Sequence, residues 1–323
     1  MPHISVIVPC HNAQAFIQRC LESAVGQTDR DLEIVVVDDA STDGTRDVIK
    51  EMSAQDSRIR LIERETNGGA GCARNTGIDA ATGDWIAVLD ADDWYDPQRL
   101  EVLISAAEKD GALIVADNQY FVSERSGRPW QVLRDKIGQD ATRLSCDDLL
   151  LGDHLSKSRN FGLLKPVIQR KFLLESGIRY DEEPGIGEDF YFLLKCVQRA
   201  SHILFLSKPM YFYRTHSKSL TRSLSSSQII PLRTYHDRCS ELFKGVVPDS
   251  TQTLMETRGR QIETYMRYKL VVTALREGNI KVGFLKIISD PPVLALLARA
   301  LFFRVARKVM ARFLRRNLQW DIG

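Results

Sequence analysis

The chain has 323 residues, of which 44% are hydrophobic and 27% are charged, so it can bury the core of a globular protein. Its 44 Lys and Arg nearly balance its 42 Asp and Glu, which argues against nucleic acid as a partner. The six cysteines form no CxxC pair, and we expect them to be reduced core residues.

The first 116 residues alternate short apolar runs with helical patterns. Strands are predicted at 4–8, 32–37, 59–63, 85–89 and 112–116, and helices at 13–25, 43–55, 70–81 and 97–109. Strands that are separated by helices favour a mostly parallel sheet with helices on both faces. The predicted fold class is therefore α/β.

The remainder of the chain is less regular at first and then helical. After an irregular stretch at 117–165, helices are predicted near 170–176 and 187–199, with two short strands in HILFL and MYFYR. From residue 226 on the pattern is helical, with breaks at 244–250 and 290–292.

Polar residues follow four of the predicted strands at the point where each strand ends. In a parallel sheet, ligands bind beyond the carboxyl ends of the strands, so we expect these residues to meet at one edge. They are Pro9, His11 and Asn12, then Asp38 and Asp39, then Asn67, Gly68 and Gly69, and finally Asp90, Asp92 and Asp93.

Several common nucleotide and hydrolase motifs are missing from the sequence. The turn after the first strand reads PCHN, without the glycines that let a backbone approach a dinucleotide pyrophosphate. The sequence also has neither a P-loop nor a G-x-S-x-G elbow, the motifs of P-loop NTPases and α/β-hydrolases. These observations argue against a dinucleotide-dependent oxidoreductase.

Four segments carry a resemblance to a known family. They are VIVPCHN, VVVDDASTDGT, NGGAGCARNTGIDAATGDWIAVLDADDWYDP and GIGEDFYFLLK. In this order they resemble the nucleotide-sugar glycosyltransferases of family 2 over roughly residues 2–220. The resemblance implies the GT-A fold, with a nucleotide-binding half at 1–116, an acceptor-binding half at 117–220 and a helical region at 221–323. It also implies transfer of a sugar from a nucleotide diphosphate to an acceptor hydroxyl.

The resemblance assigns the nucleotide to the ends of the first two strands. Asp39 matches the carboxylate that reads uracil, since an ionised carboxylate accepts the hydrogen of N3. Pro9 and His11 match residues that pack on the base, and Asn12 lies beside them. The alternative for the acidic turn is structural, because Asp38 and Asp43 could cap the helix that follows.

The segment GGAGCARN places glycines, including Gly69, directly before a helix. A helix start offers free N–H groups and positive potential to a diphosphate. The resemblance puts Arg74 near the phosphates or the carboxylates. The alternative for Arg74 is a structural ion pair with Asp90 or Asp93.

The acidic stretch DADD follows an apolar run, where neighbouring carboxylates repel one another unless a cation offsets them. Such hard oxygen ligands recruit Mg²⁺ or Mn²⁺. By the resemblance, Asp92 binds the metal ion and Asp90 contacts the ribose or a metal-bound water, while Asp93 braces the loop. His216 matches a further metal ligand of the family, although a lone histidine is often an ordinary surface or core residue.

The segment GIGEDFYFLLK supplies a base for the acceptor hydroxyl. A carboxylate within hydrogen-bond reach can take the proton as the hydroxyl attacks the anomeric carbon. The resemblance makes Asp189 the base and leaves Glu188 to orient the acceptor. The alternative is that both acids are present because a helix start stabilises negative charge.

Residues 293–319 contain seven Lys or Arg and no acid. The basic residues lie opposite an apolar helical face, which is typical of a helix that lies in an anionic membrane surface. The alternative is a helix that packs on the protein itself or on a partner.

The sequence thus predicts an inverting, metal-dependent glycosyltransferase that uses a UDP-sugar. The resemblance implies an acceptor that is a lipid-linked or surface polysaccharide intermediate. No signal peptide or spanning helix is expected, so the protein would work at the cytoplasmic face of a membrane. An oligomer is compatible with the sequence. A metal-dependent nucleotidyltransferase and a non-catalytic sugar-nucleotide-binding module are the alternatives.

Overall fold

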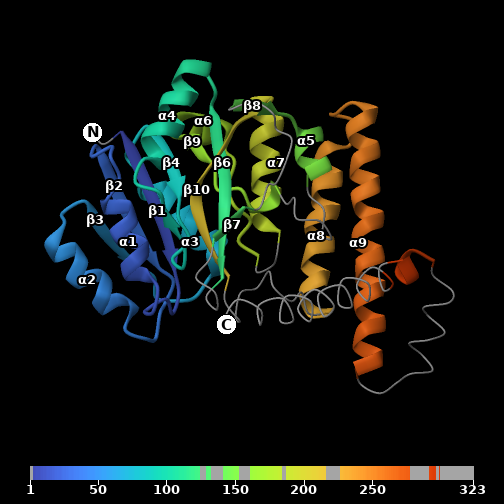
Figure 1. Ribbon diagram of the computed structural model, residues 1–323, viewed down its shortest axis with the longest axis horizontal. Coiled ribbons are helices and arrows are strands. Elements are labelled where there is room, and N and C mark those ends of the chain that lie inside the picture. The colour runs from blue at the N-terminus through green and yellow to red at the C-terminus, as the bar shows by residue number, and fades with distance from the viewer. Residues whose placement is uncertain are drawn as a thin grey trace, which may run out of the picture.

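The computed structural model describes residues 3–123, 129–131, 141–152, 161–183, 187–215, 226–276, 291–295 and 298. A mixed β-sheet runs through the molecule with helices packed against it (Figure 1). The order of its strands is β3-β2-β1-β4-β9-β6-β10-β5, with β7 paired to β6 and β8 paired to β10.

The first half of the fold agrees with the predicted alternation of strands and helices. The strands β1 (Ile4–Cys10), β2 (Leu32–Asp38), β3 (Ile59–Glu63) and β4 (Trp85–Val88) are parallel neighbours. The helices between and after them are α1 (Ile17–Val25), α2 (Thr45–Gln55), α3 (Gly69–Ala80) and α4 (Arg99–Asp110).

The second half of the sheet is mixed. The predicted fifth strand is β6 (Ile114–Ser123), but β9 (Val167–Gln169) lies between β4 and β6 and is antiparallel to both. The short strands β5 (Trp94–Tyr95), β7 (Pro129–Gln131) and β8 (Ala141–Leu144) extend the sheet. Short antiparallel strands of this kind carry little periodic pattern in sequence.

One strand prediction was wrong. HILFL and MYFYR were expected to be separate strands, whereas β10 (Ile203–Thr215) runs through both of them. Its register with β6 shifts on either side of Pro209, which has no N–H to donate to the ladder. The proline therefore marks an irregularity within a strand and not the end of one.

The other helices are α5 (Cys146–Gly152), the 3₁₀ turn η1 (Phe161–Leu163), α6 (Arg170–Ser176), α7 (Glu188–Ala200), α8 (Ser226–Phe243) and α9 (Asp249–Arg276). Helices α8 and α9 pack side by side at the end of the molecule opposite β3 and α2 (Figure 1). Most of the predicted basic helix at 293–319 lies outside the described residues.

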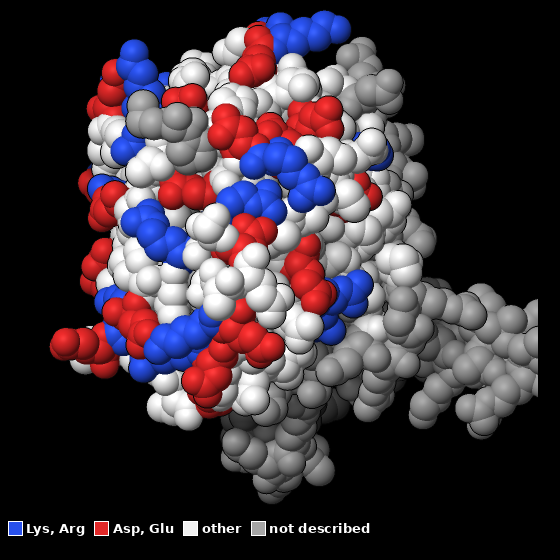
Figure 2. Space-filling view, turned by 90° about the vertical axis from the view of Figure 1, so that its left-hand side faces the viewer, with Lys and Arg blue, Asp and Glu red and all other residues white. Residues whose placement is uncertain are grey.

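The core has two main layers, one on each face of the sheet. Along β1, Ile4, Val6 and Val8 belong to one apolar cluster and Ile7 to the other, as the alternation of side chains along a strand requires. The six cysteines are free thiols, as expected, but only Cys10, Cys20, Cys196 and Cys239 are buried core residues, whereas Cys72 and Cys146 are half-buried. At the end of the molecule with α2 and β3, acidic and basic side chains are interspersed over the surface (Figure 2), for example where Lys50 pairs with Glu63.

Candidate active site

The ends of β1 and β2 bring the predicted base-binding residues together. The ring Nδ1 of His11 lies 2.7 Å from the carbonyl oxygen of Asp39, and Pro9 is the register partner of Val37 on β2. Asn12 has a φ of 50°, and its Oδ1 accepts a hydrogen bond from the backbone N–H of Thr42 at 2.8 Å. Pro9, His11, Asn12 and Asp39 therefore lie together at the carboxyl ends of β1 and β2.

The carboxylate of Asp39 joins the end of β2 to the start of α3. Its Oδ1 accepts from Arg64 Nη1 at 2.6 Å and from the N–H of Gly68 at 3.0 Å, and its Oδ2 accepts from the N–H of Gly69 at 2.7 Å. Gly69 has a φ of 85°, a conformation that favours glycine. Asp39 is thus held by the helix start that the sequence assigns to the diphosphate.

The neighbouring acids stabilise the turn before α2. Asp38 accepts from the N–H of Ser41 at 3.1 Å and from Arg46 Nε at 2.5 Å. Asp43 accepts from the N–H of Thr45 at 3.0 Å. Asp43 therefore binds the first N–H of α2, in keeping with the structural alternative, whereas Asp38 binds the turn and the Arg46 side chain and does not cap the helix. Asp39 is left as the acid that faces α3.

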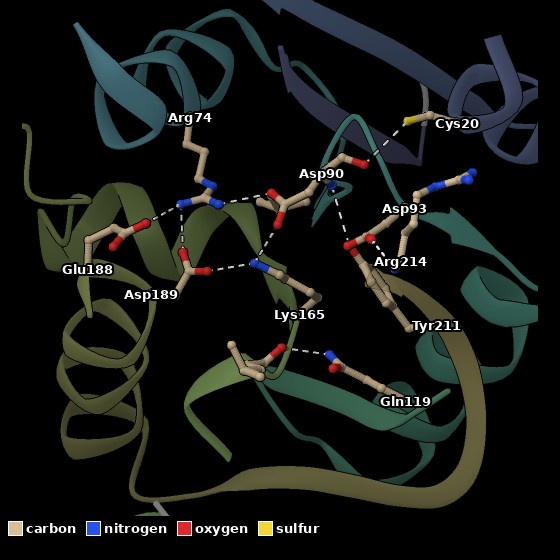
Figure 3. A network of polar contacts seen from close by, with 12 residues as sticks. Cys20, Arg74, Asp90, Asp93, Gln119, Lys165, Glu188, Asp189, Tyr211 and Arg214 are labelled. Atoms are coloured by element: carbon tan, nitrogen blue, oxygen red, sulfur yellow. Dashed lines mark hydrogen bonds and ion pairs between the residues drawn. The ribbon is translucent and has the colours of Figure 1, made fainter. Parts of the chain in front are cut away.

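Arg74, from α3, contacts three carboxylates that come from two other parts of the chain. Its guanidinium lies 2.9 Å from Asp90, 2.6 Å from Asp189 and 3.3 Å from Glu188 (Figure 3). The Arg74 side chain is only 5% exposed. The predicted pair with Asp90 is present, while the guanidinium turns to α7 and not to Asp93.

Lys165 completes this cluster from the segment before β9. Its Nζ lies 2.7 Å from Asp90 Oδ2 and 2.6 Å from Asp189 Oδ2 (Figure 3). Asp90 and Asp189 are therefore each bound by both cations. The strand-end acid and the predicted base, 99 positions apart in sequence, meet in one ring of alternating charges.

The charges of this ring shift the pKa values of Asp90, Lys165 and Arg74. Burial by itself would raise the pKa of Asp90, but the charges of Lys165 and Arg74 outweigh burial, and the pKa is lowered. For Lys165 and Arg74, burial is outweighed in turn by Asp189 and Asp90, and both pKa values are raised. Burial, followed by the charge of Asp189, raises the pKa of Glu188. Asp90 is therefore ionised and both cations are charged at neutral pH.

Asp93 braces the acidic loop against β10, as predicted. Its carboxylate accepts from the hydroxyl of Tyr211 at 2.6 Å and from the backbone N–H of Arg214 at 2.8 Å. Burial, and then the charges of Asp92 and Asp90, raise the pKa of Asp93 well above its usual value. A cation bound at this loop would relieve that repulsion.

Asp92 is half-buried in the same loop, and Arg214 Nε donates to its backbone carbonyl at 2.9 Å. Within the described ranges, no three His, Cys, Asp or Glu residues are grouped so that they could hold a metal ion by themselves. His216 lies outside those ranges. Mg²⁺ typically takes one or two carboxylates together with substrate phosphates and waters, and the carboxylates of this loop fit that requirement.

The sequence interpretation missed Lys165, Arg64 and the role of Tyr211. Lys165 lies in an irregular stretch and belongs to no motif, so nothing in the sequence linked it to the acids. Arg64 was detectable, because it directly follows β3 at the edge where the acids gather. Tyr211 alternates with its neighbours on β10 and would have required the register of that strand.

Comparison with known proteins identifies the family. The model of glycosyl transferase family 2 matches residues 5–164. The succinoglycan biosynthesis protein ExoO of Rhizobium meliloti (strain 1021) is 31% identical over 314 residues, which cover 97% of this chain and 88% of that protein. The chain belongs to glycosyl transferase family 2. The predicted family and enzyme class are confirmed, and the protein is a glycosyltransferase.

Solved structures share the fold of this family 2 glycosyltransferase. The match to S. aureus TarS 1-349 in complex with UDP-GlcNAc has a TM-score of 0.63 at 22% identity. It covers 81% of this chain and 71% of the TarS chain. The match to the mannosyltransferase PcManGT from Pyrobaculum calidifontis in complex with GDP-Man and Mn²⁺ has a TM-score of 0.61 at 18% identity. It covers 100% of this chain and 88% of the PcManGT chain. The predicted GT-A architecture is confirmed.

Among the described residues, no helix is both long enough and apolar enough to cross a bilayer.

Proposed function

We propose that this glycosyltransferase moves a sugar from a UDP-sugar to an acceptor hydroxyl with inversion at the anomeric carbon. The observation that carries the proposal is the contact of Arg74 and Lys165 with both Asp90 and Asp189. These contacts bring the predicted base beside the strand end that we assign to the donor. On the same basis we propose that residues 1–116 bind the nucleotide and residues 117–220 the acceptor, with 221–323 as a helical extension.

The nucleotide would lie across the ends of β1 and β2. Pro9, His11 and Asn12 would contact the uracil and ribose, and Asp39 would accept the hydrogen of uracil N3. Support comes from the burial of Asp39, which is 4% exposed, because a hydrogen bond to a buried carboxylate discriminates strongly between bases. Gly69 and Arg74 would lie toward the diphosphate.

A divalent metal ion would be bound at the acidic loop, with Asp92 as the principal protein ligand. Asp90 and His216 are the further candidates. When bound, Mg²⁺ or Mn²⁺ would stabilise the charge of the departing diphosphate as a Lewis acid. Support comes from the position of Asp90 and Asp92 in the loop directly after β4, because one or two carboxylates with substrate phosphates and waters suffice for Mg²⁺.

In the proposed reaction, Asp189 accepts the proton of the acceptor hydroxyl while that oxygen forms a bond to the anomeric carbon. The bond between this carbon and the diphosphate oxygen breaks, and its electron pair leaves with UDP. Attack from the face opposite the leaving group inverts the anomeric configuration. Glu188, which starts α7 beside Asp189, would orient the acceptor.

The acceptor that we propose is a lipid-linked or surface saccharide of polysaccharide biosynthesis. The similarity to a succinoglycan biosynthesis protein supports this class of acceptor. The basic residues at 293–319 would bind the anionic lipids of the membrane that carries such an acceptor. This contact would hold the protein at the cytoplasmic face.

The proposal is tested by incubating the protein and its D189N variant with a panel of UDP-sugars and saccharide acceptors. We expect D189N to bind UDP with the wild-type Kd and to lose about 100- to 10,000-fold in transfer rate. The surface variant D237N is the control. Among the described residues, the ion-pair partner of Asp237 is Arg233 on the same helix, α8, and the Asp237 side chain is 56% exposed. Transfer by D189N at the wild-type rate would contradict the proposed base. Transfer by neither protein with any donor would favour a non-catalytic binding module.

A further inference from the structure

The ring of charges around Asp189 includes a lysine that no motif assigns. Lys165 is 5% exposed, and its Nζ lies within hydrogen-bond distance of both Asp90 and Asp189. The family model ends one residue before it, at residue 164. A buried ammonium with two carboxylate partners is costly to desolvate, so its presence beside the proposed base requires an explanation.

The backbone around Lys165 is fixed from two directions. Its carbonyl oxygen accepts from Arg99 Nη2 at 2.6 Å, and Arg99 is itself paired with Asp117 in the core. On the N-terminal side, the carbonyl oxygen of Leu163 accepts from Gln119 Nε2 at 2.7 Å. Pro166 follows directly and disfavours a helical backbone at Lys165. The core thus aims the lysine side chain at the acids.

The two carboxylates of the ring are each bound by both cations, but they come from different elements. The backbone of Asp90 is fixed at the end of β4, where its carbonyl accepts from the N–H of Asp93 at 3.0 Å. Asp189 is the second residue of α7. In the described structure, Arg74 and Lys165 are the two side chains that contact its carboxylate, one on each oxygen.

Arg74 by itself could not replace this arrangement. Its guanidinium is shared among Asp90, Asp189 and Glu188, so three negative charges compete for one cation. Lys165 supplies the second positive charge and binds Oδ2 of Asp189, whereas Arg74 binds Oδ1. Two donors on two different oxygens fix the plane of the carboxylate, which one donor cannot do.

From these contacts we propose that Lys165 is a positioning residue for sugar transfer, which holds the carboxylate of Asp189 in the orientation that accepts the acceptor proton. This inference rests on the proposed function, in which Asp189 is the base. Lys165 acts through Asp189 and contacts no substrate in this proposal. A displacement of a reacting group by about 1 Å can cost roughly 100-fold in rate.

The test compares K165M and K165A with the wild type in acceptor-dependent UDP release, with the Kd for UDP and the Tm measured in parallel. We expect kcat to fall about 100-fold, while the Kd for UDP and the KM for the donor stay near wild-type values. Addition of n-propylamine, which replaces the atoms removed in K165A, should restore part of kcat in a saturable manner. The same amine should not restore D189N.

The matched control is K195M. Lys195 lies on α7 and donates to the backbone carbonyl of Arg179 at 2.7 Å, away from the ring, so K195M should keep the wild-type kcat. Wild-type kcat in K165M would overturn the inference. So would a loss in K165A that propylamine does not restore, or one matched by equal losses in UDP affinity and Tm. An inactive wild type would instead overturn the proposed function.

Discussion

The side chains of Arg99 and Asp117 form an ion pair inside the core. Arg99 Nη2 lies 2.8 Å from Asp117 Oδ1, and the two side chains are 0% and 1% exposed. The second carboxylate oxygen of Asp117 accepts from the backbone N–H of Met210 at 2.9 Å. The variant D117N would keep the shape of the site but leave the guanidinium without a counter-charge.

The expected cost follows from this burial. Removing one partner of a fully buried ion pair costs about 3–5 kcal/mol, because the other charge remains desolvated. In a domain of this size such a loss lowers Tm by roughly 10 °C. Since Arg99 also binds the carbonyl oxygen of Lys165, we expect D117N to reduce the transfer rate even at temperatures where it stays folded.

Urea denaturation and thermal melting of the wild type and D117N measure the loss. The matched control is D110N, because Asp110 pairs with Arg143 and His202, whose side chains are 60% and 28% exposed. Solvent-accessible pairs of this kind contribute at most about 1 kcal/mol each. A D117N variant that is no less stable than D110N would refute the reasoning. A D117N variant that loses stability but keeps full activity below its Tm would refute the proposed link between Arg99 and Lys165.

Three further predictions concern pH, packing and metal. Burial, and then the charge of Arg258, lower the pKa of His236 to about 4, so the unfolded chain binds more protons than the folded chain between pH 6.5 and 4. The free energy of unfolding, measured with urea, should therefore decrease as the pH is lowered through that window, and it should decrease less in H236Q. In G71A the new Cβ would lie 2.0 Å from the carbonyl oxygen of Asp181, so this variant should lose about 1–3 kcal/mol in urea unfolding. Chelation should abolish transfer and added Mn²⁺ or Mg²⁺ restore it, with transfer that persists in chelator counting against Asp92 as a metal ligand.

The first 116 residues of the fold were predictable because their pattern is local. Buried parallel strands read as apolar runs, and their ends identified Asp39 and Asp90 before any contact was known. The fold of residues 117–220 was less predictable. The insertion of β9 between β4 and β6 depends on pairing between residues far apart in sequence, and the short segments involved carry no period of their own.

The same distinction applies to the site. Asp189 and Arg74 stood in motifs, so their types and places were expected, although their direct contact was not. Lys165 became visible only with the fold, because its position depends on the hydrogen bond that Arg99 donates to its backbone. A residue whose role comes from tertiary contacts alone leaves no pattern in a single sequence.

The proposed mechanism requires the donor to lie across the carboxyl ends of β1, β2 and β4. A crystal structure of the protein with UDP and Mn²⁺ measures this directly. We predict the uracil between His11 and Asp39 and the diphosphate beside Asp92. UDP bound away from this edge of the sheet, or in the reverse orientation with its uracil at Asp92, would contradict the account.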